Sequence, residues 1–89
     1  MEGIVDLFIS DEKLDTLDLS SFEMPDIEIL ATLNYVISQK KIKCLKLSHN
    51  KLTNEGFNQM ISLLKFTTNL NLSYNLLTED ILNQLIKQR

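Results

Sequence analysis

Hydrophobic residues follow two different periods along this chain, and the change from one to the other occurs within short segments. In the segment CLKLSHNKLTNEGF, residues 44–57, leucines alternate with polar residues as in a β-strand with one buried face. After Asn50 the apolar positions follow the i, i+3, i+4, i+7 spacing of an amphipathic helix: Phe57, Met60, Ile61 and Leu64. The pattern therefore predicts a strand, a turn at the asparagine, and a helix.

The same strand and turn pattern occurs three times, with starts that lie 28 and then 25 residues apart. The units read Leu14-x-x-Leu17-x-Leu19-x-x-Phe22-x-Met24, Ile42-x-x-Leu45-x-Leu47-x-x-Asn50-x-Leu52, and Thr67-x-x-Leu70-x-Leu72-x-x-Asn75-x-Leu77. The first unit differs by having Phe22 in place of the asparagine and Met24 in place of the last leucine. The chain is thus predicted to be built from three repeats at about 14–41, 42–66 and 67–89.

Helical stripes lie between and around the strands. They comprise Ile29, Leu30, Leu33, Val36 and Ile37, then Ile81, Leu82, Leu85 and Ile86, and at the amino terminus Ile4, Val5, Phe8 and Ile9. A strand followed by a crossover helix gives a parallel neighbour. We therefore predict an α/β fold, with an N-terminal helix in residues 1–13, three parallel strands and about four helices in one domain, residues 1–89.

Polar residues at fixed places in each unit are expected to hold the turns. Asn50 and Asn75 can bond to backbone groups that the turn leaves unpaired, whereas Phe22 would fill the first turn by apolar packing. Thr53 and Thr78 can cap the helices that follow, Pro25 suits a helix start, and Gly56 allows close approach there.

The segment LKLSHNKLTNEGFNQMISLL, residues 45–64, resembles the long, helix-containing leucine-rich repeats of the ribonuclease-inhibitor type. The resemblance covers about residues 14–89. It implies a right-handed solenoid with strands on the concave side and helices on the convex side, and a protein-interaction scaffold as the function. Because three repeats are few, the alternative is a structural subunit or a fragment of a larger array that stacks through its open sheet edges.

Composition narrows the functional class. With 44% hydrophobic and 24% charged residues, the chain has the balance of a folded soluble protein. Its single cysteine excludes an internal disulfide and fits a reducing compartment. The first residues lack the features of a signal peptide, and no apolar run is long enough for a transmembrane helix. We expect an intracellular, cytoplasmic protein that does not contact membranes.

Acidic and basic residues are concentrated in different parts of the chain. Residues 1–28 hold nine acidic residues against Lys13, whereas residues 29–89 hold eight basic residues against three acidic ones. Such asymmetry can steer a partner, or favour self-association of the open ends head to tail; the plain alternative is a solvated surface.

No group of residues in the sequence indicates a catalytic, metal-binding or nucleic-acid-binding site. Cys44 and His49 are too far apart along an extended strand to form a catalytic pair, and no spacing supports a metal site. The run Lys40–Lys46 lacks arginine and interleaved aromatics, so we interpret it as a solvated corner and not as a nucleic-acid site. Neither a glycine-rich phosphate loop nor a nucleophile elbow is present. We expect no enzyme activity, catalytic residues or cofactor.

The outward strand positions form the candidate site, which should bind a protein partner of unknown identity. If the units stack in register, these positions make columns across the concave face, with Tyr74 and His49 as anchors and Asp18 and Lys46 setting the charge preference. The columns are Thr16, Cys44 and Asn69; Asp18, Lys46 and Asn71; Ser20, Ser48 and Ser73; and, at the turn, Ser21, His49 and Tyr74.

Overall fold

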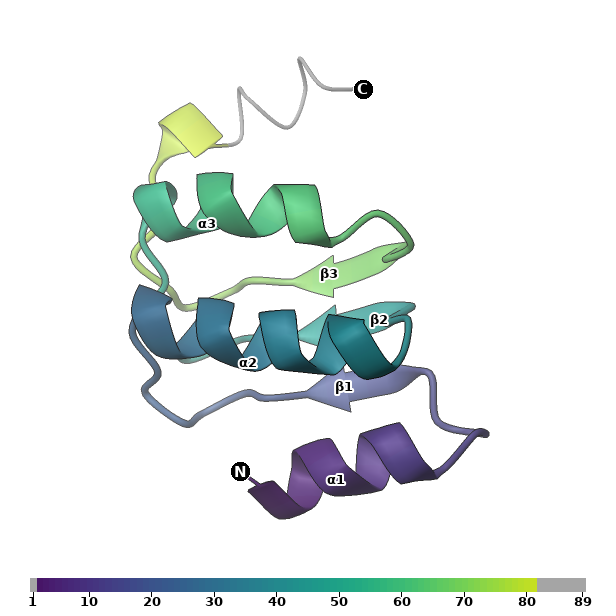
Figure 1. Cartoon of the computed structure of the whole chain (residues 1–89). Coiled ribbons are helices and arrows are strands. Elements are labelled where there is room, and N and C mark those ends of the chain that lie inside the picture. Colours follow the sequence, from purple (N-terminus) through teal and green to yellow (C-terminus); the bar gives the residue numbers. More distant parts are fainter. Residues whose placement is uncertain (1, 82–89) are drawn as a thin grey trace.

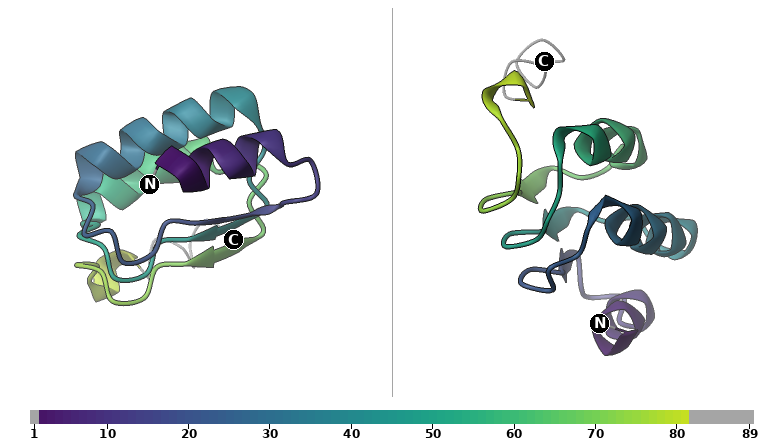
Figure 2. Two further views of the ribbon diagram at one scale, coloured as in Figure 1. Left: turned by 90° about the horizontal axis from the view of Figure 1, so that it is seen from below. Right: turned by 90° about the vertical axis from the view of Figure 1, so that its left-hand side faces the viewer.

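A computed structural model describes residues 2–81 of the chain as two layers, with helices on one side of a parallel sheet (Figures 1 and 2). The elements in chain order are α1 (Glu2–Ser10), β1 (Thr16–Asp18), α2 (Asp26–Gln39), β2 (Cys44–Lys46), α3 (Asn54–Met60), the 3-10 helix η1 (Ile61–Leu63) and β3 (Asn69–Asn71). A further helical turn starts at residue 79, and the rest of the helix predicted from Ile81, Leu82, Leu85 and Ile86 lies outside the described residues. Within residues 2–81, no helix is both long and apolar enough to cross a membrane.

The sheet has the strand order β1-β2-β3, and both pairs are parallel. Leu17 pairs with Leu45, and Leu45 pairs with Leu70, so the repeats are aligned without a register shift. Each strand is short because regular pairing extends over only three residues before the turn begins. The predicted α/β class and the three parallel strands are confirmed.

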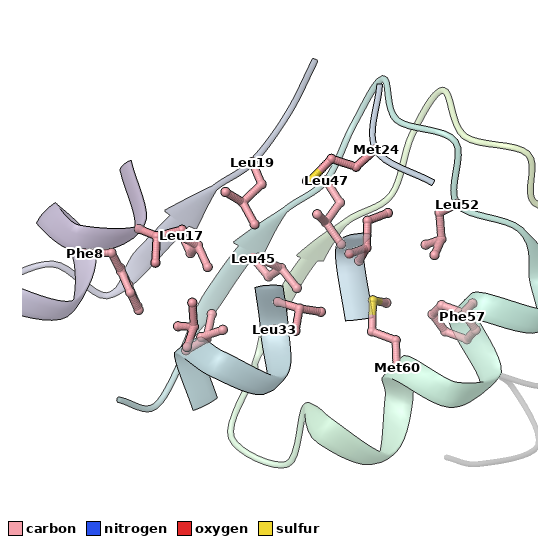
Figure 3. Packing of buried hydrophobic residues seen from close by; sticks show 14 of the residues in the cluster. Phe8, Leu17, Leu19, Met24, Leu33, Leu45, Leu47, Leu52, Phe57 and Met60 are labelled. Atoms are coloured by element: carbon pink, nitrogen blue, oxygen red, sulfur yellow. The ribbon is translucent and has the colours of Figure 1, made fainter. Parts of the chain in front are cut away.

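The apolar core lies between the sheet and the helices. Leu17, Leu19, Leu45 and Leu47 project from the first two units toward residues such as Leu33 on α2 and Met60 on α3 (Figure 3). Full burial of one such side chain contributes roughly 1.5–3 kcal/mol. Because consecutive strands contribute to the same core, each unit is stabilised by its neighbours.

The N-terminal end of the sheet is covered by α1. Val5 and Phe8 on this helix are buried in the common core. The helix itself lies next to β1 (Figure 1). The helix ends at Ser10, earlier than predicted, and the backbone N–H of Lys13 then donates to Asp11 Oδ1 at 3.0 Å. The first unit is therefore not an open end.

Lys40 fixes α1 to the rest of the protein. Its Nζ donates to the carbonyl oxygens of Phe8, Asp11 and Leu14 at 2.7, 2.8 and 2.6 Å, and it lies 4.3 Å from the centroid of the Phe8 ring. A cation at a helix C-terminus is favourable because the last carbonyls lack intrahelical partners. For Lys40, the expectation of a solvated corner is wrong.

At the other end of the sheet, β3 is much less covered. Leu70 is 37% exposed, whereas the equivalent Leu17 and Leu45 are fully buried. Leu72 and Leu77 are half-buried, although Ile81 beyond them is buried. The third unit has packing partners on only one side among the described residues, so its apolar face is incompletely buried.

A ladder of asparagines joins the units at the turns, as the sequence predicts. Asn50 Oδ1 accepts from the backbone N–H of Met24 at 2.9 Å, and Asn50 Nδ2 donates to the Leu19 carbonyl at 2.9 Å. One unit further on, Asn75 Oδ1 accepts from Leu52 N–H at 2.9 Å and Nδ2 donates to the Leu47 carbonyl at 2.8 Å. Each asparagine therefore satisfies the turn of the unit before it.

This geometry corrects the interpretation of Phe22. The first turn is not filled by Phe22, whose side chain is 38% exposed. The backbone N–H of Met24 and the Leu19 carbonyl in this turn are instead hydrogen-bonded by the Asn50 side chain of the second unit. The first unit thus needs no asparagine of its own to complete its turn toward the second unit.

A second ladder runs along the helix starts. The Asp26 carboxylate accepts from the backbone N–H of Thr53 at 2.8 Å and from its hydroxyl. Thr53 also caps α3, since its hydroxyl oxygen accepts from Gly56 N–H at 3.4 Å. A Cβ on Gly56 would collide with the Asp26 side chain, so the predicted close approach at this glycine is confirmed.

One unit further on, Asn54 takes the place of Asp26. Its Nδ2 donates to the Thr78 hydroxyl at 2.6 Å, and its Oδ1 accepts from Thr78 N–H at 3.0 Å. Thr78 is therefore bonded to the preceding unit.

Pro25 occupies the N-cap position of α2, as the sequence predicts for a helix start.

Candidate protein-interaction face

The candidate site is the face of the sheet that the helices do not cover, together with the turns that follow the strands; we name it the open face (Figure 2). Alternation along the strands sends Leu17, Leu45 and Leu70 to the helix side, so their neighbours lie on the open face. The pairing places the predicted residues in columns, Thr16 beside Cys44 beside Asn69, and Asp18 beside Lys46 beside Asn71. The predicted arrangement of these residues is thus present in the structure.

Side chains on the open face are small or polar, and some are held by local bonds. Asp18 Oδ1 accepts from Ser20 N–H at 3.0 Å, and the equivalent Asn71 Oδ1 accepts from Ser73 N–H at 3.1 Å and from its hydroxyl at 2.7 Å. Lys46, between them, is exposed. The face therefore presents one carboxylate, one ammonium group and one amide in a row across the three strands.

Ser21, His49 and Tyr74 form the column at the turn. All three have positive φ angles, 65°, 56° and 58°, although none is glycine. The turns stack through backbone bonds: Ser21 N–H donates to the Ser48 carbonyl at 2.9 Å and His49 N–H to the Ser73 carbonyl at 3.1 Å. A left-handed conformation costs an L-residue roughly 1–2 kcal/mol, so the stacked turns hold these side chains in an unfavourable backbone geometry.

The rings of His49 and Tyr74 are stacked, with centroids 4.3 Å apart and planes inclined by 8°. Both side chains are exposed, and Tyr74 retains 75% of its accessible surface. The backbone fixes both residues and the rings restrict each other, so a partner would order them at little cost in conformational entropy. This aromatic pair is the largest fixed feature of the open face.

The remaining candidates do not form a reactive centre. Cys44 is a free, half-buried thiol in the column between Thr16 and Asn69. Over residues 2–81, no group of three or more histidine, cysteine and acidic side chains is arranged to hold a metal ion.

The helix side is the alternative binding surface that the sequence leaves open. A shallow groove of about 300 Å³ lies where α2 and α3 begin, lined by Asp26, Ile27, Leu30, Glu55, Gly56 and Gln59. Ile27 is mostly exposed there, and Tyr35 further along α2 is also exposed. Ile27 could have been noticed in the sequence because it precedes the buried stripe that starts at Ile29.

Comparisons with protein-family models, with curated proteins and with solved structures find no match for this chain. Its function must therefore be inferred from the arrangement of its own residues. The open face and the groove at the starts of α2 and α3 are the two surfaces to weigh. The open face draws aligned residues from all three units, whereas the groove is lined by two helices only.

Proposed function

We propose that this chain is a non-enzymatic protein-interaction module of the leucine-rich-repeat type, similar to the ribonuclease-inhibitor class, and that it binds a protein partner through its open face. A solenoid arrangement is supported by the in-register parallel strands and by the two ladders of side-chain bonds that link each unit to the next. In such an arrangement the open face is the concave side, and its aligned columns form a continuous binding surface. The single thiol, Cys44, supports an intracellular location.

The observation that carries this proposal is the stacked His49–Tyr74 pair. Interfaces depend on a few anchors, and tyrosine is among the residues most often found in that role. The exposed rings project from a rigid turn, and the small serines beside them let a partner approach closely. The residues that line the groove between α2 and α3 include no aromatic side chain, so that surface offers no comparable pair of fixed rings.

A structural role is the second candidate, and the incomplete burial of β3 favours it. Leu70 is partly exposed and Leu76 is 60% exposed, so a further strand or another protein could add to this edge. The N-terminal end offers no such surface because α1 covers it. Stacking in this form would therefore extend the sheet at β3 only.

The leading proposal can be tested by capturing a partner from the native source and measuring its affinity for variants of the two surfaces. Tyr74→Ala should weaken binding of the captured partner by about 2 kcal/mol, roughly 30-fold in the dissociation constant, because it removes an anchor. Gln59→Ala, in the groove between the helices, serves as the matched control and should have little effect. If the partner bound the Tyr74 variant normally and lost affinity with the Gln59 variant, binding would belong to the helix side.

A further inference from the structure

Charged residues occupy equivalent positions in the first two units but have opposite signs. The structure aligns two such pairs: Asp18 pairs with Lys46 in the sheet, and Lys43 N–H donates to the Asp15 carbonyl at 3.2 Å. Glu23 and Lys51 are not aligned, because Lys51 is bridged to Pro25. We name the exposed residues of the first unit the acidic stripe and those of the second the basic stripe: Asp15 and Asp18 against Lys43 and Lys46. The third unit has the uncharged residues Thr68 and Asn71 in these places.

We propose that the first two units of the open face bind a second copy of this chain, related to the first by a two-fold axis that runs parallel to the strands between β1 and β2. Such a rotation lays β1 of one copy over β2 of the other, and the reverse. Asp18 then faces Lys46 of the second copy, while Lys46 faces Asp18 of the second copy. The flanking pair at 15 and 43 matches in the same way, because the strands keep their direction. This inference rests on the proposed use of the open face and names a partner for its first two units; Tyr74, in the third unit, lies outside the overlapping strands and is not an anchor of this contact.

The charge pattern selects this arrangement over other contacts between copies. An axis placed over β1 would bring the acidic stripes together, and an axis over β2 would bring the lysines together; like charges that face one another disfavour association. The neutral third unit adds neither attraction nor repulsion.

Side-chain size agrees with the same axis. Thr16 would lie opposite Cys44 of the second copy, and Ser20 opposite Ser48, so small groups meet in the centre. At the turn, the small Ser21 would lie opposite the larger His49 ring. The two faces can therefore approach closely enough for the charged stripes to interact.

The dimer should be weak and sensitive to salt. Strands lie about 4.8 Å apart, so a three-stranded face is narrow and its buried area belongs to the small class of interfaces typical of transient complexes. The four charges are exposed, and exposed charges are screened over about 8–10 Å at ionic strengths of 0.1–0.15 M. We expect a dimer at high protein concentration in low salt, and dissociation as salt is added.

Two double variants that keep the net charge of −3 test the pairing directly. D18K/K46D reverses one pair and keeps opposite charges facing each other, so its dimerisation should stay within about threefold of the natural chain. D18K/K43E places the new ammonium group at position 18 opposite Lys46 of the second copy, and the new carboxylate at position 43 opposite Asp15. Its dimer should be at least about tenfold weaker, because like charges then face each other. Both variants lose the bond from Ser20 N–H to Asp18, so any local effect on the fold is shared.

Sedimentation equilibrium at low and high salt would measure the association of the natural chain and both variants. Equal association of the two variants, or a natural chain that stays monomeric at high concentration in low salt, would overturn the inference. Growth beyond a dimer would instead indicate head-to-tail contacts, and would also overturn it.

A dilution series of the natural chain observed by NMR does not depend on how the variants fold. Amide shifts that change with concentration should cluster on β1, β2 and the turns; shifts confined to α2 and α3 would contradict the proposed face. If the chain is monomeric but Tyr74→Ala still weakens a captured partner, the self-association fails while the proposed function of the open face stands.

Discussion

Asn50 connects the first two units, and its replacement by alanine is the sharpest test of how the repeats are held together. The side chain is only 6% exposed and makes four hydrogen bonds to backbone groups. Two of these satisfy groups of the preceding unit, the Met24 N–H and the Leu19 carbonyl. Alanine would leave both groups without their partner in an interior that water cannot readily enter.

The expected cost follows from those two groups. An unsatisfied buried donor or acceptor costs about 1–3 kcal/mol, and partial relaxation reduces the sum, so Asn50→Ala should lower the free energy of unfolding by about 2–3 kcal/mol. For a domain of this size, that corresponds to a fall in Tm of roughly 10–20 °C. Asn75→Ala should cost less, because Asn75 is only half-buried and water can reach its partners.

Chemical denaturation followed by circular dichroism would measure this loss of stability. Asn69→Ala is the control: it removes the same type of side chain from an exposed strand position and should change the stability by no more than about 0.5 kcal/mol. Similar losses for Asn50→Ala and Asn69→Ala would refute the role of the asparagine ladder.

Two further substitutions test contacts between distant segments. Lys40→Met keeps the aliphatic stem but removes three bonds, to the Phe8 carbonyl in α1 and to the Asp11 and Leu14 carbonyls after it. It should cost about 1–2 kcal/mol and speed amide hydrogen exchange in α1, while Lys43→Met should do neither. Gly56→Ala should destabilise the protein by about 1–3 kcal/mol because the new methyl group collides with Asp26. Gly3→Ala is the control: its methyl group meets nothing within 4 Å, so it should be neutral or stabilising. Thermal unfolding would show whether the two variants differ.

The strands and their register could be predicted because they depend on local pattern. Leu17 and Leu45 alternate with polar residues, and equal spacing within each unit is sufficient to align them. The same spacing is sufficient to predict the columns of the open face. The stacked rings of His49 and Tyr74 were not predicted, because ring orientation depends on the left-handed turns beneath them.

Other contacts were missed because they join segments far apart in the sequence. Lys40 appears in the sequence as one of several neighbouring lysines, and only the position of α1 shows that it binds three carbonyls. Asp26 resembles an ordinary acidic residue in the first turn of a helix, yet its carboxylate accepts from Thr53 of the next unit. Phe22 was misinterpreted because the asparagine that completes its turn belongs to the second unit.

An NMR cross-saturation map of the labelled chain bound to its captured partner would show directly whether partners bind the open face. Binding there predicts that transfer is strongest at the amides of Asp18, Lys46, Ser73 and Tyr74 and weak along α2 and α3. Strong transfer at Ile27, Tyr35 and Gln59, with the strand and turn amides unaffected, would place the binding site on the helices and contradict binding through the open face.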